Sequence, residues 1–340
     1  MNPPAASDTL TGEMLEALES DLRVAATLPG ADACAQMGEM ISYHLGWSGE
    51  ASSRRGKRIR PLLTLLTCAS AGGDWHAALP VASSVELIHN FSLVHDDIQD
   101  QSDERRGRPT VWKLWGVAQA LNTGDALLVL ARLSTYRLLN QGLPAFRVQE
   151  NQRLLDQACL DLTRGQHLDL AFESRKDVTT DEYFAMIEGK TAALIAAAAA
   201  CGACVAGVAD ETTQAYWRYG RHLGLAFQLL DDILGTWGEP NVTGKPAGDD
   251  LRSRKKTLPA LIGLEGSAEF ARLWASPPSE HEDIRPMTAL LEEAGALAKT
   301  QLQAHHHTGL ALSELESATL ASQAGAELKQ LTLRLLQRDR

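Results

Sequence analysis

The chain has 340 residues, enough for one large hydrophobic core or two ordinary domains. Its formal net charge of -11 at pH 7 argues against a nucleic acid as the main partner, because such partners need a positive surface. Lys and Arg nevertheless cluster at residues 54–60, 105–108 and 252–256, which points to a small anionic ligand.

The cysteines and the apolar runs predict a cytoplasmic protein. Five cysteines are an odd number, and the pair Cys201 and Cys204 lies in an alanine run that lacks the strand context of a redox site. We therefore expect buried thiols in a reducing compartment. Residues 1–11 are polar, and the longest apolar run, residues 192–200, is too short for a membrane span.

The hydrophobic spacing predicts helices along the whole chain, whereas alternation typical of strands never exceeds a few residues. Residues 1–10 are expected to be disordered, and residues 110–116 to connect two helices. The predicted helices cover residues 11–28, 31–43, 62–70, 75–94, 118–140, 147–172, 180–189, 191–205, 211–235, 257–264, 268–275, 287–308 and 314–337. The sequence thus predicts one all-α domain spanning residues 1–340.

Three carboxylates follow the apolar helix of residues 75–94. Asp96 and Asp100 are four positions apart and therefore share a helix face, and Asp97 lies beside them. Acids this close repel one another unless a cation compensates them. A solvated helix end is the ordinary alternative, but the apolar residues before the acids favour a metal site, and oxygen ligands favour Mg²⁺.

A second apolar helix ends in the pair Asp231 and Asp232, with Gln228 about one turn earlier. Between the two acidic clusters lies Gly189-Lys190-Thr191, where two predicted helices meet, and Lys245 follows the second cluster. Two carboxylate clusters and several cations suit a diphosphate that is bridged to the protein by Mg²⁺.

His305, His306 and His307 could suggest another metal site. Successive helical residues point about 100° apart, so the three rings cannot converge on one ion, and we interpret them as a solvated segment.

These motifs, in this order, resemble the trans-isoprenyl diphosphate synthases, most closely the short-chain geranylgeranyl diphosphate synthases. The resemblance covers about residues 20 to 335. It is carried by Lys57-Arg58-Ile59-Arg60-Pro61, Asp96-Asp97-Ile98-Gln99-Asp100, Arg105-Arg106-Gly107, Gly189-Lys190-Thr191 and Gln228-Leu229-Leu230-Asp231-Asp232.

The resemblance implies a bundle of antiparallel helices around a deep central cavity, usually in a homodimer. It implies head-to-tail condensation, in which an allylic diphosphate ionises and the double bond of isopentenyl diphosphate attacks the cation. Three Mg²⁺ ions would bind Asp96, Asp100 and Asp231, while Asp97 and Asp232 would orient those ligands.

The resemblance also assigns the substrate contacts. The allylic diphosphate would be held by Arg105, Lys190 and Lys245, and the isopentenyl diphosphate by Lys57, Arg60, His89 and Arg106. The side-chain oxygens of Thr191 and Gln228 would stabilise the cation. The released diphosphate can accept the proton, so no side chain is required as a base.

One position departs from the family pattern. Gly235 stands where the second acidic motif usually has a third aspartate, so metal binding there is expected to be weaker or differently hydrated. The departure leaves open a terpene cyclase on the same fold, although a cyclase has no need of Lys57, Arg60, His89 and Arg106. A catalytically silent subunit is a third interpretation, although such a subunit would be expected to lose its acid clusters.

The helix before Asp96 predicts the product length. Ser92 lies one turn deeper than Asp96 and leaves room for a growing tail, Phe91 forms a side wall, and Ile88 lies another turn below. An aromatic residue followed by a small one resembles producers of geranylgeranyl diphosphate (C20), with farnesyl diphosphate (C15) as the alternative.

Residues 235–256, rich in Gly and Pro, are a candidate mobile lid over bound substrate.

Overall fold

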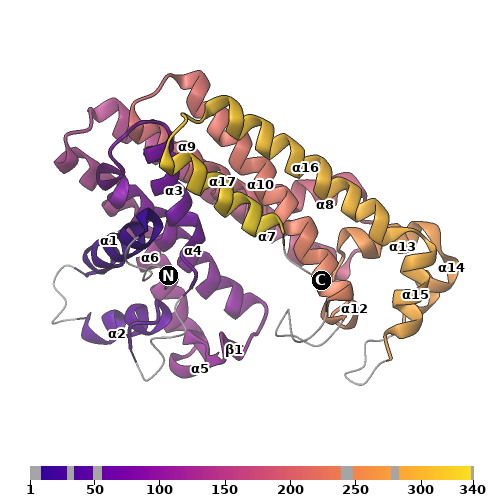
Figure 1. Ribbon diagram of the computed structural model, residues 1–340. Helices are drawn as coiled ribbons and strands as arrows, with labels where there is room; N and C mark the ends of the chain where they lie inside the picture. Colours follow the sequence, from indigo (N-terminus) through magenta and orange to yellow (C-terminus); the bar gives the residue numbers. More distant parts are fainter. Residues whose placement is uncertain (1–8, 29–33, 49–55, 239–247, 277–282, 338–340) are drawn as a thin grey trace, which may run out of the picture. The chain divides into compact units, whose positions relative to one another are not determined.

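The computed structural model describes residues 9–28, 34–48, 56–238, 248–276 and 283–337, and these form an almost entirely helical protein (Figure 1). Contacts divide the chain into two compact units. Unit 1 comprises Met1–Asp156, Ala198–Thr213 and Thr319–Leu328; unit 2 comprises Gln157–Ala197, Gln214–Ala318 and Lys329–Arg340. Each unit is described by itself below.

The elements that lie wholly within unit 1 come from the first part of the chain. They are α1 (Leu10–Ala25), α2 (Ala35–His44), α3 (Ile59–Ser70), η4 (Trp75–Ala78), α4 (Leu79–Gln99), β1 (Glu104–Arg105), β2 (Arg108–Pro109), α5 (Val111–Trp115), α6 (Val117–Tyr136) and η5 (Arg137–Gln141). The strands β1 and β2 pair antiparallel in a minimal hairpin.

The remaining elements belong wholly or partly to unit 2. They are α7 (Ala145–Ser174), α8 (Thr180–Ile187), η6 (Glu188–Ala192), α9 (Ala193–Ala206), α10 (Asp210–Trp237), α12 (Asp249–Arg252), α13 (Leu258–Gly266), α14 (Ala268–Trp274), α15 (Arg285–Glu293), α16 (Ala296–Ala318) and α17 (Gln323–Leu336). Helices α7, α9, α10 and α17 contribute residues to both units.

Helix α4 forms the centre of unit 1 and packs against α1, α3 and α6. Its buried hydroxyl groups are satisfied, since Ser84 donates to the carbonyl of Ala131 on α6 at 2.8 Å. In return, Ser134 on α6 donates to the carbonyl of Pro80 on α4 at 2.8 Å. These bonds fix the relative position of the two helices because unpaired buried polar groups are costly.

Small residues let helices of unit 2 approach closely. A Cβ added to Gly220 of α10 would lie 2.7 Å from the Cα of Ala196, and one on Gly224 would lie 2.5 Å from the Cα of Ala192. The alanine run of residues 192–200 thus provides a surface for backbone contact. In Figure 1, α10 also runs beside α16, and Arg218 and Glu314 join them through an ion pair of 2.7 Å.

Several predicted boundaries are wrong. The helix predicted at residues 287–308 is two helices, because Gly295 adopts a φ of 70° between α15 and α16. Helix α16 then runs to Ala318, so the predicted break between residues 308 and 314 does not exist. The connector predicted at residues 110–116 contains the short helix α5, and α12 interrupts the irregular segment at residues 235–256.

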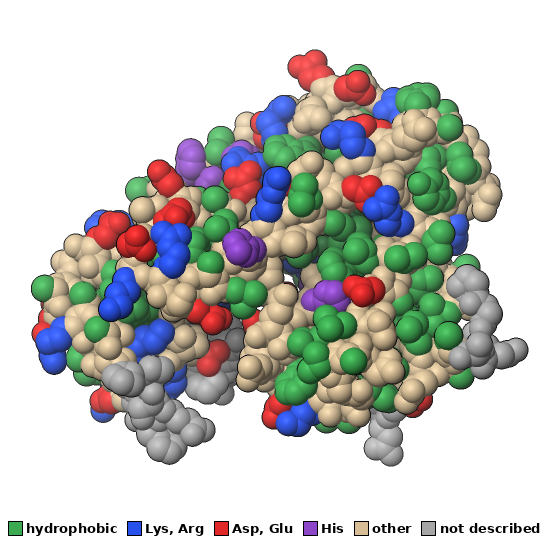
Figure 2. All heavy atoms as spheres, turned by 180° about the vertical axis from the view of Figure 1, so that it is seen from behind, with side chains coloured by type: hydrophobic (Ala, Val, Ile, Leu, Met, Phe, Trp, Pro, Cys, Tyr) green, Lys and Arg blue, Asp and Glu red, His purple; other side chains and the backbone are tan. Residues whose placement is uncertain are grey.

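Two long helical stretches, Trp75–Gln99 and Thr180–Ala206, are apolar enough to cross a membrane by length and composition. In the apolar 18-residue window of each stretch, 78% and 72% respectively is buried within the protein, as expected for core helices. On the face shown in Figure 2, acidic and basic side chains are interspersed with hydrophobic ones.

All five cysteines are free thiols. Cys68, Cys201 and Cys204 are buried, and Cys159 is half-buried. Burial raises the pKa of the Cys201 thiol well above its ordinary value, so this group stays protonated. Cys34 is exposed, which corrects the expectation that every thiol is buried.

Candidate active site

The first acidic cluster lies at the C-terminal end of α4 in unit 1. The backbone N–H of Asp100 donates to the carbonyl of Asp96 at 2.8 Å, so the helical repeat places these two residues on one face. Asp100 is exposed and Asp96 is partly exposed. Asp97, by contrast, is only 2% exposed and points into the protein. The cluster therefore offers two accessible carboxylates, supported by a third that is buried.

The buried Asp97 is held by Arg105. Nε and Nη2 of Arg105 both lie 2.7 Å from Oδ1 of Asp97. Burial raises the pKa of Asp97, and the Arg105 guanidinium opposes this effect only in part. Arg105 is thereby oriented by the acid motif itself, eight residues earlier in the chain.

Arg106 occupies the turn between β1 and β2. Arg106 and Gly107 have φ values of 55° and 67°, as the two central residues of a tight primed turn require. The Arg106 guanidinium packs over Gly56, where a Cβ would lie 2.8 Å from Nη2. The hairpin is tied to α2 by the Tyr43 hydroxyl, which donates to the carbonyl of Pro109 at 2.8 Å. A strained backbone thus directs the Arg106 side chain.

Two histidines in the same unit are kept neutral. Nε2 of His89 lies 3.3 Å from Nη1 of Arg60, another residue predicted to bind the isopentenyl diphosphate. Burial, followed by the charges of Arg60, Arg106 and Arg105, lowers the pKa of His89 well below its ordinary value. Burial and several arginines lower the pKa of His44 to about 3. His44 was not predicted as a site residue.

Arg58 is the support for the basic loop before α3. It is 4% exposed, its Nη1 lies 2.6 Å from Oε1 of the buried Glu86, and its Nε lies 2.8 Å from Oε1 of Glu19. Its φ of 49° lets the chain turn into α3 immediately after it. This structural anchor places Lys57, which is exposed, and Arg60 on either side of it.

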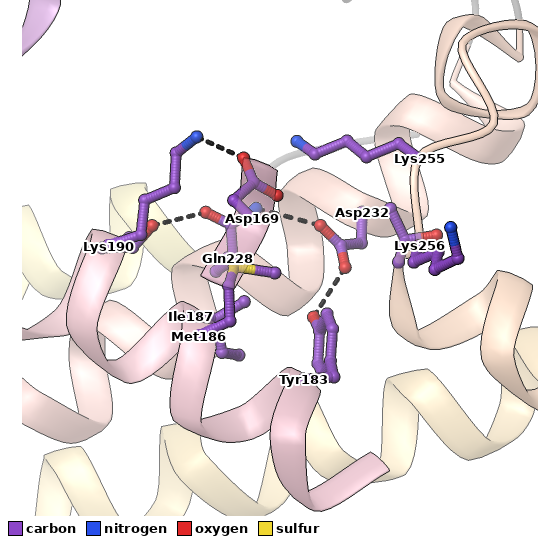
Figure 3. Close-up of a pocket in the computed structure, with 11 residues that line it drawn as sticks. Asp169, Tyr183, Met186, Ile187, Lys190, Gln228, Asp232, Lys255 and Lys256 are labelled. Carbon is purple, nitrogen blue, oxygen red and sulfur yellow. Dashed lines mark hydrogen bonds and ion pairs between the residues drawn. The ribbon is translucent and has the colours of Figure 1, made fainter. Parts of the chain in front are cut away.

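Unit 2 contains a pocket around Asp232 (Figure 3), here named the Asp232 pocket. It is lined by Asp169, Tyr183, Met186, Ile187, Lys190, Thr191, Gln228, Asp232, Lys255, Lys256 and Thr257. Four of these residues were predicted from the sequence: Lys190, Thr191, Gln228 and Asp232.

A chain of hydrogen bonds runs through this pocket. The Thr191 hydroxyl donates to Oε1 of Gln228 at 2.7 Å, and Nε2 of Gln228 donates to Oδ1 of Asp232 at 2.9 Å. The Tyr183 hydroxyl donates to the other oxygen of Asp232 at 2.6 Å. Burial raises the pKa of Asp232 to about 6, although Lys255, Tyr183 and Gln228 act in the opposite direction. Asp232 therefore holds the side chains of Gln228 and Tyr183 in defined positions.

Lys190 enters the pocket from a π-helical turn. The turn, η6, separates α8 from α9, and such turns occur often at functional sites. A Cβ on Gly165 of α7 would lie 2.1 Å from the backbone nitrogen of Lys190, so only glycine permits this approach. The contact brings Asp169 of α7 within 2.5 Å of the Lys190 ammonium.

Lys255 and Lys256 reach the pocket from the segment before α13. Lys256 donates to the carbonyls of Phe172 and Glu173 and so compensates the C-terminal end of α7. Desolvation lowers the pKa of Lys255, but surrounding carboxylates, Asp250 foremost, raise it overall. The two neighbouring lysines therefore have different roles. Lys256 caps the C-terminal end of α7, whereas the Lys255 ammonium faces carboxylates (Figure 3).

The family model for polyprenyl synthetase matches residues 47–293 of this chain, a range that contains the acidic cluster of α4 and every residue that lines the Asp232 pocket. The chain belongs to the polyprenyl synthetase family. Its fold is accordingly the all-α fold of that family, and the chain is a transferase of the trans-prenyltransferase type.

Individual relatives support this assignment. A (2E,6E)-farnesyl diphosphate synthase of Mycobacterium tuberculosis is 44% identical over 315 residues, covering 89% of this chain and 86% of that protein. A geranylgeranyl diphosphate synthase of the same organism is 42% identical over 288 residues, covering 82% and 81%. The crystal structure of geranylgeranyl pyrophosphate synthase from Corynebacterium glutamicum, complexed with isoprenyl diphosphate and magnesium, matches with a TM-score of 0.79 at 29% identity and covers 97% and 98%.

Sequence reasoning missed several polar residues of this polyprenyl synthetase. Asp169, Tyr183 and Lys255 line the Asp232 pocket, yet only Lys255 stood in a segment that the basic run had marked. Lys245, predicted to bind the allylic diphosphate, lies outside the described residues, as do residues 239–247 of the candidate lid. In the described part of the chain, no group of three or more His, Cys, Asp and Glu side chains is placed to hold a metal ion.

Proposed function

We propose that this polyprenyl synthetase condenses isopentenyl diphosphate head-to-tail with an allylic diphosphate, and that its product is geranylgeranyl diphosphate (C20). Dimethylallyl, geranyl and farnesyl diphosphates are the proposed allylic substrates. The observation that carries the proposal is the Asp232 pocket. Its lining includes the Lys190 ammonium, the Thr191 hydroxyl, the Gln228 amide oxygen and the buried carboxylate of Asp232.

The allylic half of the reaction suits this pocket. The Lys190 ammonium provides charge for a diphosphate, and Arg105 and Lys245 are proposed to add to it. The oxygens of Thr191 and Gln228 are held in place by their mutual hydrogen bond and would stabilise the allylic cation. Such fixed dipoles act strongly because they need no reorganisation when charge develops.

The exposed carboxylates fit Mg²⁺ by their chemistry. Asp96 and Asp100 share one helix face, and Mg²⁺ is commonly bound by one or two carboxylates together with substrate phosphates. We propose that three Mg²⁺ ions bind at Asp96, Asp100 and Asp231, with Asp97 and Asp232 as orienting residues. When bound, the ions would neutralise the negative charge of the leaving diphosphate.

The isopentenyl half is proposed to use Lys57, Arg60, His89 and Arg106. The contact between Arg60 and His89 supports this grouping, as does the lowered pKa of His89. A neutral imidazole can donate a hydrogen bond to a diphosphate oxygen without competing for a proton. These residues argue against a terpene cyclase, which would ionise a single diphosphate.

The product length is the finer part of the proposal. Ser92 is 6% exposed, and its hydroxyl donates back to the carbonyl of His89, so it presents little bulk. Phe91 packs edge-on against His95 at 5.2 Å between ring centroids, as a side wall would. Ile88, one turn below Ser92, is buried. Farnesyl diphosphate (C15) is the second candidate product, because a relative named (2E,6E)-farnesyl diphosphate synthase is 44% identical to this chain.

The test incubates purified protein with isopentenyl diphosphate and each allylic diphosphate in turn, with and without Mg²⁺. Products are then dephosphorylated and identified by chromatography with mass spectrometry. Mg²⁺-dependent C20 alcohol supports the proposal. C15 alcohol as the end product would establish the second candidate, and hydrocarbon formed without isopentenyl diphosphate would establish a cyclase.

We also propose that the protein is a homodimer joined through α6. Exposed apolar side chains recur along one face of this helix at a spacing of three or four residues, except where the exposed Asp125 interrupts them midway. The side chains are Val117, Leu121, Val129, Leu133 and Tyr136. Light scattering coupled to size exclusion should give a dimer mass that Leu133→Glu reduces, whereas Leu302→Glu, on exposed α16 surface, leaves it unchanged.

The compartment proposed is the cytoplasm. Its support is the five free thiols, since persistent disulfides are rare in that compartment.

A further inference from the structure

One face of α10 contacts the π-helical turn η6 at both ends of the turn. Arg221 and Gln228 are seven residues apart with Gly224 between them, so the helical repeat places all three on this face. The Thr191 hydroxyl donates to Gln228 at 2.7 Å, and a Cβ on Gly224 would lie 2.5 Å from the Cα of Ala192. These two contacts hold the C-terminal end of the turn.

The N-terminal end of the turn is held by an ion pair. Nε of Arg221 donates to Oε1 of Glu188 at 2.7 Å, and Nη2 of Arg221 donates to Oε2 at 2.7 Å. In such a bidentate pair the planar guanidinium fixes the direction of the carboxylate as well as its distance. The carbonyl of Glu188 also accepts the hydrogen bond of the Ala193 backbone N–H, five residues later, which is the spacing of a π turn. Both the side chain and the backbone of Glu188 are therefore engaged where the turn begins.

Lys190 lies between these two attachments. On the side of α7, a Cβ on Gly165 would overlap the backbone nitrogen of Lys190, and a Cβ on Gly189 would lie 2.5 Å from the carbonyl oxygen of Asp161. The turn is thus held between α7 and α10, and its position determines where the Lys190 side chain points. That side chain lines the Asp232 pocket and reaches Asp169.

A second ion pair of α10 has the same chemistry but a different location. Arg218, about one turn before Arg221, donates through Nε and Nη2 to the two carboxylate oxygens of Glu314 on α16, at 2.7 and 2.9 Å. The side chains of the two pairs are between 24% and 44% exposed, so solvent screens both, and each contributes little to stability. The pairs differ in that Glu188 belongs to the turn that carries Lys190, whereas Glu314 does not.

We propose that Arg221 and Glu188 form a positioning pair for the allylic half of the reaction. The pair holds η6 so that the Lys190 ammonium faces the allylic diphosphate and the Thr191 hydroxyl faces the developing cation. This inference rests on the function proposed above. Neither Arg221 nor Glu188 is among the residues that line the Asp232 pocket, so both act through the turn.

The first experiment measures binding without reaction. Geranyl S-thiolodiphosphate, an allylic analogue that does not ionise, is titrated by calorimetry into the protein in the presence of Mg²⁺. Arg221→Met should weaken its binding about 10-fold, the effect of one misplaced charge-assisted hydrogen bond. The matched control is Arg218→Met, which removes an equivalent ion pair from the same helix and should leave the affinity unchanged. Both variants should have similar melting temperatures, which separates the binding effect from stability.

The second experiment separates the two substrates. Arg221→Met should raise the KM of the allylic diphosphate and lower kcat about 10- to 100-fold, because misplaced groups stabilise the cation poorly. The KM of isopentenyl diphosphate should stay unchanged, since none of its proposed ligands belongs to η6. A merely structural defect would not distinguish one substrate from the other.

The third experiment reverses the pair. Arg221→Glu alone places two carboxylates opposite each other and should weaken analogue binding at least as much as Arg221→Met. Combining it with Glu188→Arg restores opposite charges and should recover most of the lost affinity. The reversal also decides the matter if Arg221→Met folds poorly, since it keeps the number of charges constant.

A natively folded Arg221→Met protein that binds the analogue as tightly as Arg218→Met would overturn the inference, as would a reversed pair that binds no better than Arg221→Glu. Failure of the function itself looks different. In that case the unchanged protein would form no Mg²⁺-dependent prenyl product from any allylic diphosphate.

Discussion

The hydroxyl of Tyr183 donates a 2.6 Å hydrogen bond to Asp232, and both side chains are buried in unit 2. Tyr183 comes from α8 and Asp232 from α10, so the bond joins two helices at the pocket. It also leaves Asp232 with three donors, the others being Gln228 and the backbone N–H of Leu258. Because three donors fix the Asp232 carboxylate, it can position a ligand that binds beside it in the pocket.

Tyr183→Phe should therefore lower both stability and activity. It leaves a buried carboxylate oxygen short of a donor, which costs about 1–3 kcal/mol of unfolding free energy, measured by urea denaturation. Tyr219→Phe is the control, since the Tyr219 hydroxyl is buried against Thr332 at 2.7 Å, outside the pocket lining. Both variants should lose stability, but only Tyr183→Phe should lower kcat/KM. Equal kcat/KM values for the two would show that Tyr183 is merely structural.

Ser92→Phe should shorten the product. The substitution places an aromatic ring on the face of α4 that lies one turn deeper than Asp96, where the growing chain is expected to extend. Mass spectrometry of the dephosphorylated products should show a shift toward C15 or C10. Leu93→Phe adds bulk at the next position, rotated by about 100°, and should leave the product length unchanged. The same product from Ser92→Phe and the unchanged protein would contradict this placement of the chamber floor.

Arg58→Met should destabilise the fold strongly. It leaves the carboxylate of Glu86, 2% exposed, without its cation, and breaking such a pair costs about 3–5 kcal/mol. The double variant Arg58→Met with Glu86→Leu should recover most of this loss, because neither charge then remains buried. Urea denaturation of the two variants and the unchanged protein measures the effect. A double variant as unstable as Arg58→Met would rule out the charge as the cause.

Acid should destabilise the protein through His44. Its pKa is about 3 in the folded chain and about 6.5 when unfolded, so the unfolded state binds more protons between these values. The stability contributed by neutral His44 is thus fully present above about pH 6.5 and is lost as pH falls toward 3. Melting temperatures measured without metal from pH 4 to 8 should fall less steeply with acid in His44→Gln. The control His305→Gln removes an exposed histidine and should keep the original slope.

The sequence predicted those features that local spacing determines. Hydrophobic periodicity located most helices, and the four-residue spacing of Asp96 and Asp100 placed them on one face. The break at Gly295 was missed, although a glycine between two apolar patterns is a recognisable helix end. Helix α5 was missed because five residues are too few to show a helical period.

The rest of the pocket required tertiary information. Asp169 reaches Lys190 only because Gly165 lets two backbones approach, and nothing near Asp169 in the sequence indicates this. Tyr183 is fully buried, and the role of its hydroxyl depends on Asp232, which lies 49 positions later in the chain.

The π-helical turn at Glu188–Ala192 has a consequence for the length of the chain. A π turn holds one residue more than an α turn, so this stretch carries a residue that a regular helix would not need. Removing one residue here would make the helix more regular but would rotate Lys190 by about 100° relative to the residues after it. The turn should therefore accept substitutions far more readily than insertions or deletions, and among functional variants of this chain we expect its residue count to be invariant.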